Sequence, residues 1–178
     1  MSQRSMRTAQ IRMRIKVLLA VFMAGLIISG LTAFPLAAEL RVLSSILGID
    51  PATPPSDYVG LQHWIALVAA GLDETSAKYP FIAYGTDWLA FAHLVIAIAF
   101  IGPLRDPVRN VWVITFGMIA CAAVLPMALI AGAIRQIPFY WRLIDCSFGV
   151  FGLVPLWLVR RNIAVLQAIE DTHESSAR

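Results

Sequence analysis

Long apolar runs separated by short polar segments dominate the chain. Four of these runs are about as long as a helix that crosses a bilayer, which needs roughly 20 residues at 1.5 Å per residue. They cover residues 17–38, 81–104, 111–134 and 143–159. The pattern predicts an all-α integral membrane protein in which four transmembrane helices form a bundle.

The first run follows a basic segment, residues 1–16, which contains five basic residues and no acidic one. A secretory signal peptide also combines a basic head with an apolar stretch. The apolar run here is long, and no small-x-small cleavage site stands near its end, so we interpret it as a span. Pro35 lies near its exit, where a proline is tolerated because the helix ends or kinks there.

Between the first two runs the sequence is mixed. The segment PATPPSD, residues 51–57, interrupts any helix, and residues 59–72 then show apolar positions at helical spacing over a length too short to span. This pattern predicts an interfacial or re-entrant amphipathic helix. Its His63 and Trp64 would lie at the level of the lipid headgroups, where amphipathic rings are enriched.

The fourth run is the shortest of the four. It contains Gly149 and Gly152, small residues spaced to let another helix approach closely. A homodimer is compatible with the sequence. The run ends at Arg160 and Arg161. Residues 162–178 predict a cytoplasmic tail that starts as a mildly amphipathic helix and becomes polar.

Composition and charge agree with a lipid environment. The chain is 59% apolar and 14% charged, with a mean hydropathy of +0.75. Its net charge of +3 comes from clusters at the ends of apolar runs, which is typical of membrane topology and argues against nucleic-acid binding. Placing both termini and residues 105–109 on one side gives that side ten basic residues against four. Both termini are therefore predicted to be cytoplasmic, in the plasma (inner) membrane of a bacterium or the endoplasmic reticulum of a eukaryote.

The cysteines indicate no redox or metal chemistry. Cys121 and Cys146 fall in different runs, at depths that differ by on the order of 10 Å or more if the helices are antiparallel, so we expect two buried thiols and no disulfide. A CxxC motif is lacking. A haem or metal site on His93 would need a second strong ligand, and His63 is a distant candidate. We therefore expect no metal and no cofactor.

Two ionisable residues inside the second run are the main chemical signal. A charged side chain at bilayer depth costs roughly 2.5 to 3.5 kcal/mol, so it usually has a partner or a function. Asp87 is either the N-cap of a helix that starts at Trp88 or a functional acid. His93 is either a hydrogen-bonded residue between helices or part of a pocket, and it lies about 120° from Asp87 around the helix.

Three acids lie at one end of the predicted bundle, namely Glu39, Asp87 and Asp145. Salt bridges and helix caps at the headgroup boundary are the structural explanation for such residues. Asp145 follows Arg142 by three residues, a spacing that brings helical side chains together, and an ion pair between them is one prediction.

Several local patterns follow one another in an order found in a known family. The chain resembles the four-helix membrane fold (EXPERA-like) shared by the emopamil-binding sterol isomerases and the sigma-2 receptor, over most of Thr32 to Arg161. The features that carry the resemblance are the acid that ends the first run (Glu39, followed by Leu40 and Arg41), the short helix with Trp64, the early acid Asp87, the motifs VLP at 124–126 and LVP at 153–155, and the final basic pair.

The resemblance implies a pocket within the membrane for sterol-like or amine-bearing hydrophobic ligands, with acids of the first two spans at its polar end. Those positions correspond to Glu39 and Asp87. Two carboxylates close together in a low dielectric do not both ionise cheaply, which favours a cationic ligand. We therefore predict a ligand site formed by Glu39, Asp87, His93, Asp145, Trp88 and Tyr84.

Three functions are compatible with this site. The first is binding of a hydrophobic small molecule or lipid. The second is an isomerase that transfers a proton on a lipid or isoprenoid double bond, with Asp87, His93 and Glu39 as candidate catalytic residues. The third run has no acid, and His93 does not match a catalytic histidine of the isomerases, so the sequence favours binding over chemistry. The third function is a non-catalytic scaffold or regulatory subunit whose polar residues join helices.

Overall fold

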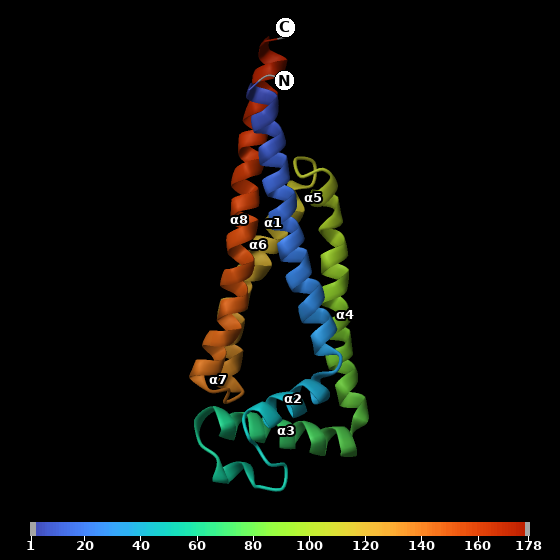
Figure 1. Cartoon of the computed structure of the whole chain (residues 1–178), viewed down its shortest axis with the longest axis vertical. Helices are drawn as coiled ribbons and strands as arrows, with labels where there is room; N and C mark the ends of the chain where they lie inside the picture. Colours follow the sequence, from blue (N-terminus) through green and yellow to red (C-terminus); the bar gives the residue numbers. More distant parts are fainter. Residues whose placement is uncertain (1–2, 177–178) are drawn as a thin grey trace. The chain divides into compact units, whose positions relative to one another are not determined.

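The computed structural model describes the backbone of residues 3–176 and the side chains of residues 6–169 (Figure 1). Every regular element in this part of the chain is helical. Four stretches are long and apolar enough to cross a membrane, namely Met6–Ala33, Pro80–Arg105, Val111–Ile134 and Phe139–Ile169. The predicted all-α class is confirmed, and the four apolar helices indicate a membrane-embedded protein.

The chain folds as two compact units. Unit 1 consists of Met1–Gly25 and Ala97–Arg178, and unit 2 is Leu26–Ile96. Helix α1 (Gln3–Ala33) begins in unit 1 and ends in unit 2, and helix α4 (Ala83–Ala99) begins in unit 2.

A helical hairpin forms much of unit 1. Its first arm is α6 (Val111–Pro126), the π-helical segment η3 (Met127–Ala131) and α7 (Gly132–Ile134), and its second arm is α8 (Phe139–Ser176). The short helix α5 (Ile101–Arg105) precedes the hairpin. The first arm covers the same residues as the predicted third span.

Glycines let the two arms of the hairpin approach closely. A Cβ added to Gly149 would lie 2.6 Å from the carbonyl oxygen of Cys121, and one added to Gly152 would lie 2.7 Å from the Cys121 sulfur. The predicted role of these glycines is confirmed, with α6 of the same chain as the neighbouring helix. Cys121 and Cys146 are free, as expected, but both are half-buried and not fully buried.

The ends of α1 and α8 differ from the prediction. Helix α1 starts at Gln3, inside the segment expected to be a separate basic N-terminus, and α8 continues through Arg160 and Arg161 as one helix of 38 residues. The predicted fourth span and the start of the predicted helical tail are therefore parts of one continuous helix. Apolar side chains at helical spacing explain the extension, because they are buried in unit 1: Ile11, Ile15 and Leu19 on α1, and Leu156, Val159, Ile163 and Leu166 on α8.

In unit 2 the chain turns sharply after its first long helix. Helix α1 ends at Ala33, and Pro35 precedes a second helix, α2 (Leu36–Ile46), which the sequence reading did not predict. A short helical turn, η1 (Pro55–Asp57), then leads to α3 (Gly60–Lys78), a longer helix than the predicted residues 59–72. Its location at the membrane interface stays a prediction.

Side-chain hydrogen bonds to carbonyl groups hold the α2–α3 layer together. Gln62 donates through Nε2 to the carbonyl oxygen of Leu47 at 2.8 Å, and α2 packs along α3. The Nδ1 atom of His63 lies 2.7 Å from the carbonyl oxygen of Pro55, and since a carbonyl oxygen only accepts, Nδ1 carries the proton. His63 thus joins η1 to α3. The turn η2 (Pro80–Ile82) connects this layer to α4.

The close contact at Gly149 can be tested with a single methyl group. In Gly149→Ala, the added methyl meets a backbone oxygen, which cannot move unless α6 shifts, so we expect a loss of roughly 1 to 3 kcal/mol in the free energy of unfolding. The control is Gly71→Ala in α3, where no atom lies within 4 Å of the added Cβ and helix propensity predicts a gain of up to about 1 kcal/mol. Unfolding in detergent with increasing dodecyl sulfate, followed by circular dichroism, measures both; equal stabilities would contradict the packing described.

Candidate functional site

Asp87 lies inside a helix and not at its start. It is the fifth residue of α4, which begins at Ala83, so the N-cap explanation for this acid is wrong. The span that contains it starts at Pro80, and Asp87 is roughly 10 Å further along. Its side chain is half-buried, and none of the described residues is hydrogen-bonded or ion-paired to its carboxylate. If this helix crosses a membrane, a carboxylate so far along it needs compensation.

An aromatic stripe lies beside Asp87 on the same helix. The ring of Trp88 makes edge-to-face contacts with the rings of Tyr84 and Phe91, with 5.9 Å between centroids in each pair. At 100° per residue, Asp87 stands about 60° from Tyr84 and about 40° from Phe91 around the helix axis. All three residues are between 50% and 61% exposed, so a large part of each is accessible.

On its other side, α4 packs against the end of α1. A Cβ added to Gly30 would lie 2.9 Å from the carbonyl oxygen of Ala90 and 3.1 Å from the Cβ of His93. His93 is therefore part of the contact between the two helices, which agrees with the interhelical alternative for this residue. Its Nδ1 donates to the carbonyl oxygen of Leu89 at 2.8 Å, an arrangement that leaves Nε2 with the lone pair in the neutral ring.

The same contact gives the level of Asp87 relative to α1. Helices α1 and α4 run in opposite directions in unit 2 (Figure 1). Moving three residues back from Ala90 to Asp87 therefore corresponds to moving three residues forward from Gly30 to Ala33, the last residue of α1. Asp87 is thus level with the corner between α1 and α2.

Glu39 follows that corner. It occupies the first turn of α2, where the positive end of the helix dipole stabilises a carboxylate, and it is exposed. Its position has a structural explanation, which Asp87 lacks. Glu39 and Asp87 belong to the same end of unit 2, in agreement with the order inferred from the sequence.

Asp145 belongs to unit 1 and lies two turns into α8. No ion pair joins it to Arg142 within the described part of the chain, so the predicted pair is wrong. The Nη1 atom of Arg142 instead donates to the carbonyl oxygen of Leu129 at 3.2 Å, and its guanidinium carbon lies 5.2 Å from the centroid of the Phe139 ring.

The acceptor of Arg142 exists because the helix before it is irregular. Pro126 has no N–H, and the π-helical segment Met127–Ala131 follows it directly, so the backbone hydrogen bonds are rearranged here. Gly132 makes room for the arginine, since an added Cβ would lie 2.6 Å from the Arg142 Cδ atom. Arg142 therefore supports the irregular segment.

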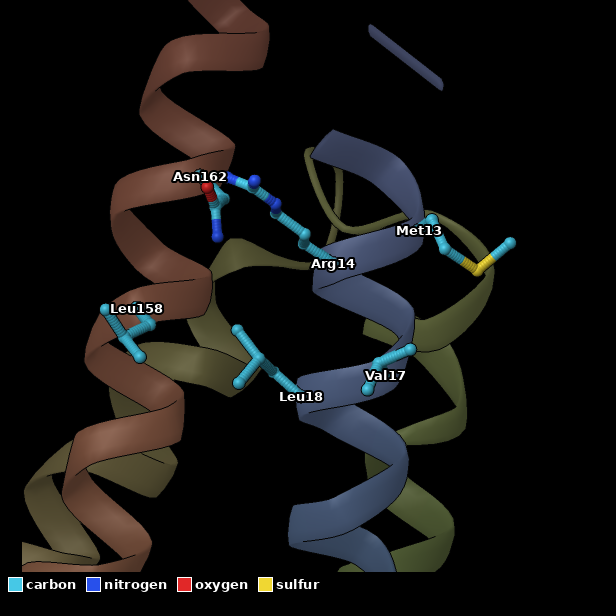
Figure 2. A pocket seen from close by; sticks show the side chains of 6 residues that line it. All are labelled: Met13, Arg14, Val17, Leu18, Leu158 and Asn162. Atoms are coloured by element: carbon cyan, nitrogen blue, oxygen red, sulfur yellow. The ribbon is translucent and has the colours of Figure 1, made fainter. Parts of the chain in front are cut away.

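Two hollows occur elsewhere, both within unit 1. One is an open groove of about 450 Å³ between α1 and α8, and Figure 2 shows Leu18 and Leu158 facing each other across it, with Arg14 and Asn162 above them. Met13 and Val17 complete its lining. The other, of about 360 Å³, is lined by Arg12, Arg105, Asp106, Val108 and Arg109. As for metals, no three His, Cys, Asp or Glu side chains gather into a potential metal site in the described part of the chain.

The residues predicted for the site did not include Phe91, and the predicted partner of Arg142 was not the observed one. The first could have been found, because Tyr84, Trp88 and Phe91 recur at a spacing of four and three residues, which places them on one helix face. The second could not, since the partner of Arg142 is a carbonyl oxygen with no signature in the side-chain pattern.

No protein-family model, curated protein or solved structure matches the chain. The resemblance to the EXPERA-like proteins stays a prediction based on the order of its motifs.

Removing the Arg142 guanidinium should loosen the irregular segment. In Arg142→Met, Leu129 loses a hydrogen bond from a charged donor, worth about 1.5 kcal/mol or more, so we expect amide hydrogen exchange in residues 127–134 to accelerate by about tenfold. Arg135→Met, which removes an exposed arginine in the following turn, is the control and should leave exchange unchanged. Equal exchange in the two variants would rule out the supporting role.

Proposed function

We propose that this membrane protein binds a hydrophobic, amine-bearing small molecule or lipid on α4, with the Asp87 carboxylate as the counter-ion of the amine. The observation that carries the proposal is the position of Asp87, half-buried inside an apolar span and too far into the helix to cap it. A cation next to this carboxylate offsets the cost of keeping a charge at membrane depth.

The aromatic stripe supplies the rest of the binding surface in this proposal. The exposed faces of Tyr84, Trp88 and Phe91 adjoin Asp87 and attract an alkylammonium group through cation–π interactions while their edges contact its hydrocarbon part. Glu39, at the same end of unit 2, acts as a second acid that adds to the negative potential. His93 borders the site from the α1 side.

The orientation belongs to the proposal as well. Both termini lie in the cytoplasm, which puts the corner between α1 and α2, and with it the site, on the opposite face of the membrane. The excess of basic residues at the ends of the spans on the side of the termini supports this orientation. The membrane is the plasma (inner) membrane in a bacterial cell or the endoplasmic reticulum in a eukaryotic one.

The role of Asp87 is tested with two probes that differ in charge. N,N-dimethyldodecylamine and 1-dodecanol have the same alkyl chain, and only the first carries a cation at neutral pH. We expect the wild-type protein in lipid nanodiscs to bind the amine roughly tenfold more tightly than the alcohol, and Asp87→Asn to abolish this preference while alcohol binding is unchanged. Quenching of tryptophan fluorescence or calorimetry measures both affinities.

The control variant is Asp57→Asn, which neutralises an exposed acid in η1 of the same unit. It should retain the preference for the amine. If Asp87→Asn also retains it, Asp87 does not belong to the site.

An enzyme acting at the same place is the second candidate, and the geometry of His93 favours it over other chemistries. With Nδ1–H bonded to Leu89, the free Nε2 lone pair is able to accept a proton from a substrate, and Asp87 is able to donate or accept one. Isomerisation of a lipid or isoprenoid double bond by proton transfer would incorporate solvent deuterium into the product. We expect this incorporation to disappear in Asp87→Asn and in His93→Ala if the protein is an isomerase.

A binding protein incorporates no deuterium but keeps the preference for the amine. A scaffold or regulatory subunit neither incorporates deuterium nor prefers the amine. Replacement of Asp87 or His93 in such a protein changes only its stability in detergent and the recovery of a copurifying partner. The two measurements therefore separate all three functions.

A further inference from the structure

The basic hollow in unit 1 is built from three separate places in the sequence. Arg12 comes from α1, Arg105 is the last residue of α5, and Arg109 precedes α6. Asp106 and Val108 complete the lining of a hollow of about 360 Å³. Three guanidinium groups and one carboxylate give the hollow a net charge of +2, which favours an anion.

The turn that holds two of these arginines is well defined. The backbone N–H of Arg109 donates to the Asp106 carboxylate at 3.1 Å, and the side-chain amide of Asn110 donates to the carbonyl oxygens of Asp106 at 2.9 Å and Gly102 at 3.3 Å. Pro103 and Pro107 are buried beside it. Because the Asp106 carboxylate accepts a bond within the turn, it serves to fix the backbone between Arg105 and Arg109.

The hollow lies at the end of the membrane spans. The second span ends at Arg105 and the third begins at Val111, so the turn between them is at the level of the headgroups. Neighbouring residues on the same elements are apolar and exposed: Met13 and Val17 on α1 and Trp112 on α6 are between 53% and 68% accessible. A molecule bound here would have an anionic head and an apolar body.

We propose that the hollow formed by Arg12, Arg105 and Arg109 binds the phosphate of an anionic phospholipid headgroup. Guanidinium groups donate two parallel hydrogen bonds to phosphate oxygens, and basic pockets at the ends of transmembrane helices are suited to anionic headgroups. The acyl chains lie along the apolar surface next to the hollow. This site is in unit 1 and attracts anions, so it does not depend on the amine site proposed for α4.

The experiment uses the full chain, purified in detergent and titrated with dioleoyl-phosphatidylglycerol while native mass spectrometry counts the bound lipids. We expect one phosphatidylglycerol to be retained preferentially over dioleoyl-phosphatidylcholine. Arg105→Gln/Arg109→Gln should weaken its binding by on the order of fivefold for each charge removed. The control, Lys16→Gln/Arg160→Gln, removes the same charge from the same end of unit 1 without touching the hollow and should change binding less than twofold.

A second variant is informative even if the double arginine variant folds poorly. Asp106→Asn keeps an oxygen that accepts the bond from Arg109 but removes the negative charge, so phosphatidylglycerol binding should tighten by on the order of fivefold. A gain of affinity does not arise from misfolding. Unchanged binding in Asp106→Asn, or equal losses in the two double variants, would overturn the proposal.

Inorganic phosphate separates the two sources of the same chemical group. If the hollow recognises a lipid, millimolar phosphate should leave the retained phosphatidylglycerol in place, because inorganic phosphate has no acyl chains to add apolar contacts. Full displacement by phosphate would assign the hollow to a soluble phosphate compound and overturn the lipid proposal.

Discussion

Close approach of helix backbones at glycine is the interaction on which the fold depends. In the most apolar window of each span, at most 22% of the residues are buried by the rest of the chain. Lipid is as apolar as these side chains, so it supplies no hydrophobic force that pulls helices together. Short-range packing contacts must therefore hold the helices together. Gly149 and Gly152 bring α8 onto α6, Gly117 accepts Phe100 and Leu156, and Gly30 brings α1 onto α4.

Hydropathy was sufficient to find four helices that are long and apolar enough to cross a membrane, and it was least informative at the ends of these helices. Residues 111–134 were located correctly because both ends are marked, by Asn110 and by the Arg135 turn. The start of α1 and the end of α8 were not, because the basic residues there share a helix with buried apolar ones such as Ile15 and Ile163. By their number of charged residues these segments are polar. Their apolar residues nevertheless recur every three or four positions, which is typical of helices with one buried face.

For the candidate site, the sequence could identify the unusual residue but not its surroundings. Asp87 was recognisable because an acid in an apolar run is rare. Its role as an N-cap depended on where the helix begins. Helix α4 follows η2 directly and begins at Ala83, four residues before Asp87, so Asp87 does not cap it. Charge spacing paired Arg142 with Asp145, yet the arginine bonds to a main-chain oxygen in the other arm of the hairpin. This bond between a side chain and a distant main-chain oxygen has no signature in the spacing of charged residues.

The π-helical segment has a consequence for residue register. A π turn holds one residue more than an α turn, so each residue after Ala131 takes the angular position that its predecessor would have in an uninterrupted helix. Without the extra residue, the place next to Arg142 would be filled by Ala131 and not by Gly132, and a methyl group would stand where the Arg142 Cδ atom lies only 2.6 Å away. The additional residue in η3 therefore places a glycine next to Arg142, at a position where a larger side chain would clash with the arginine.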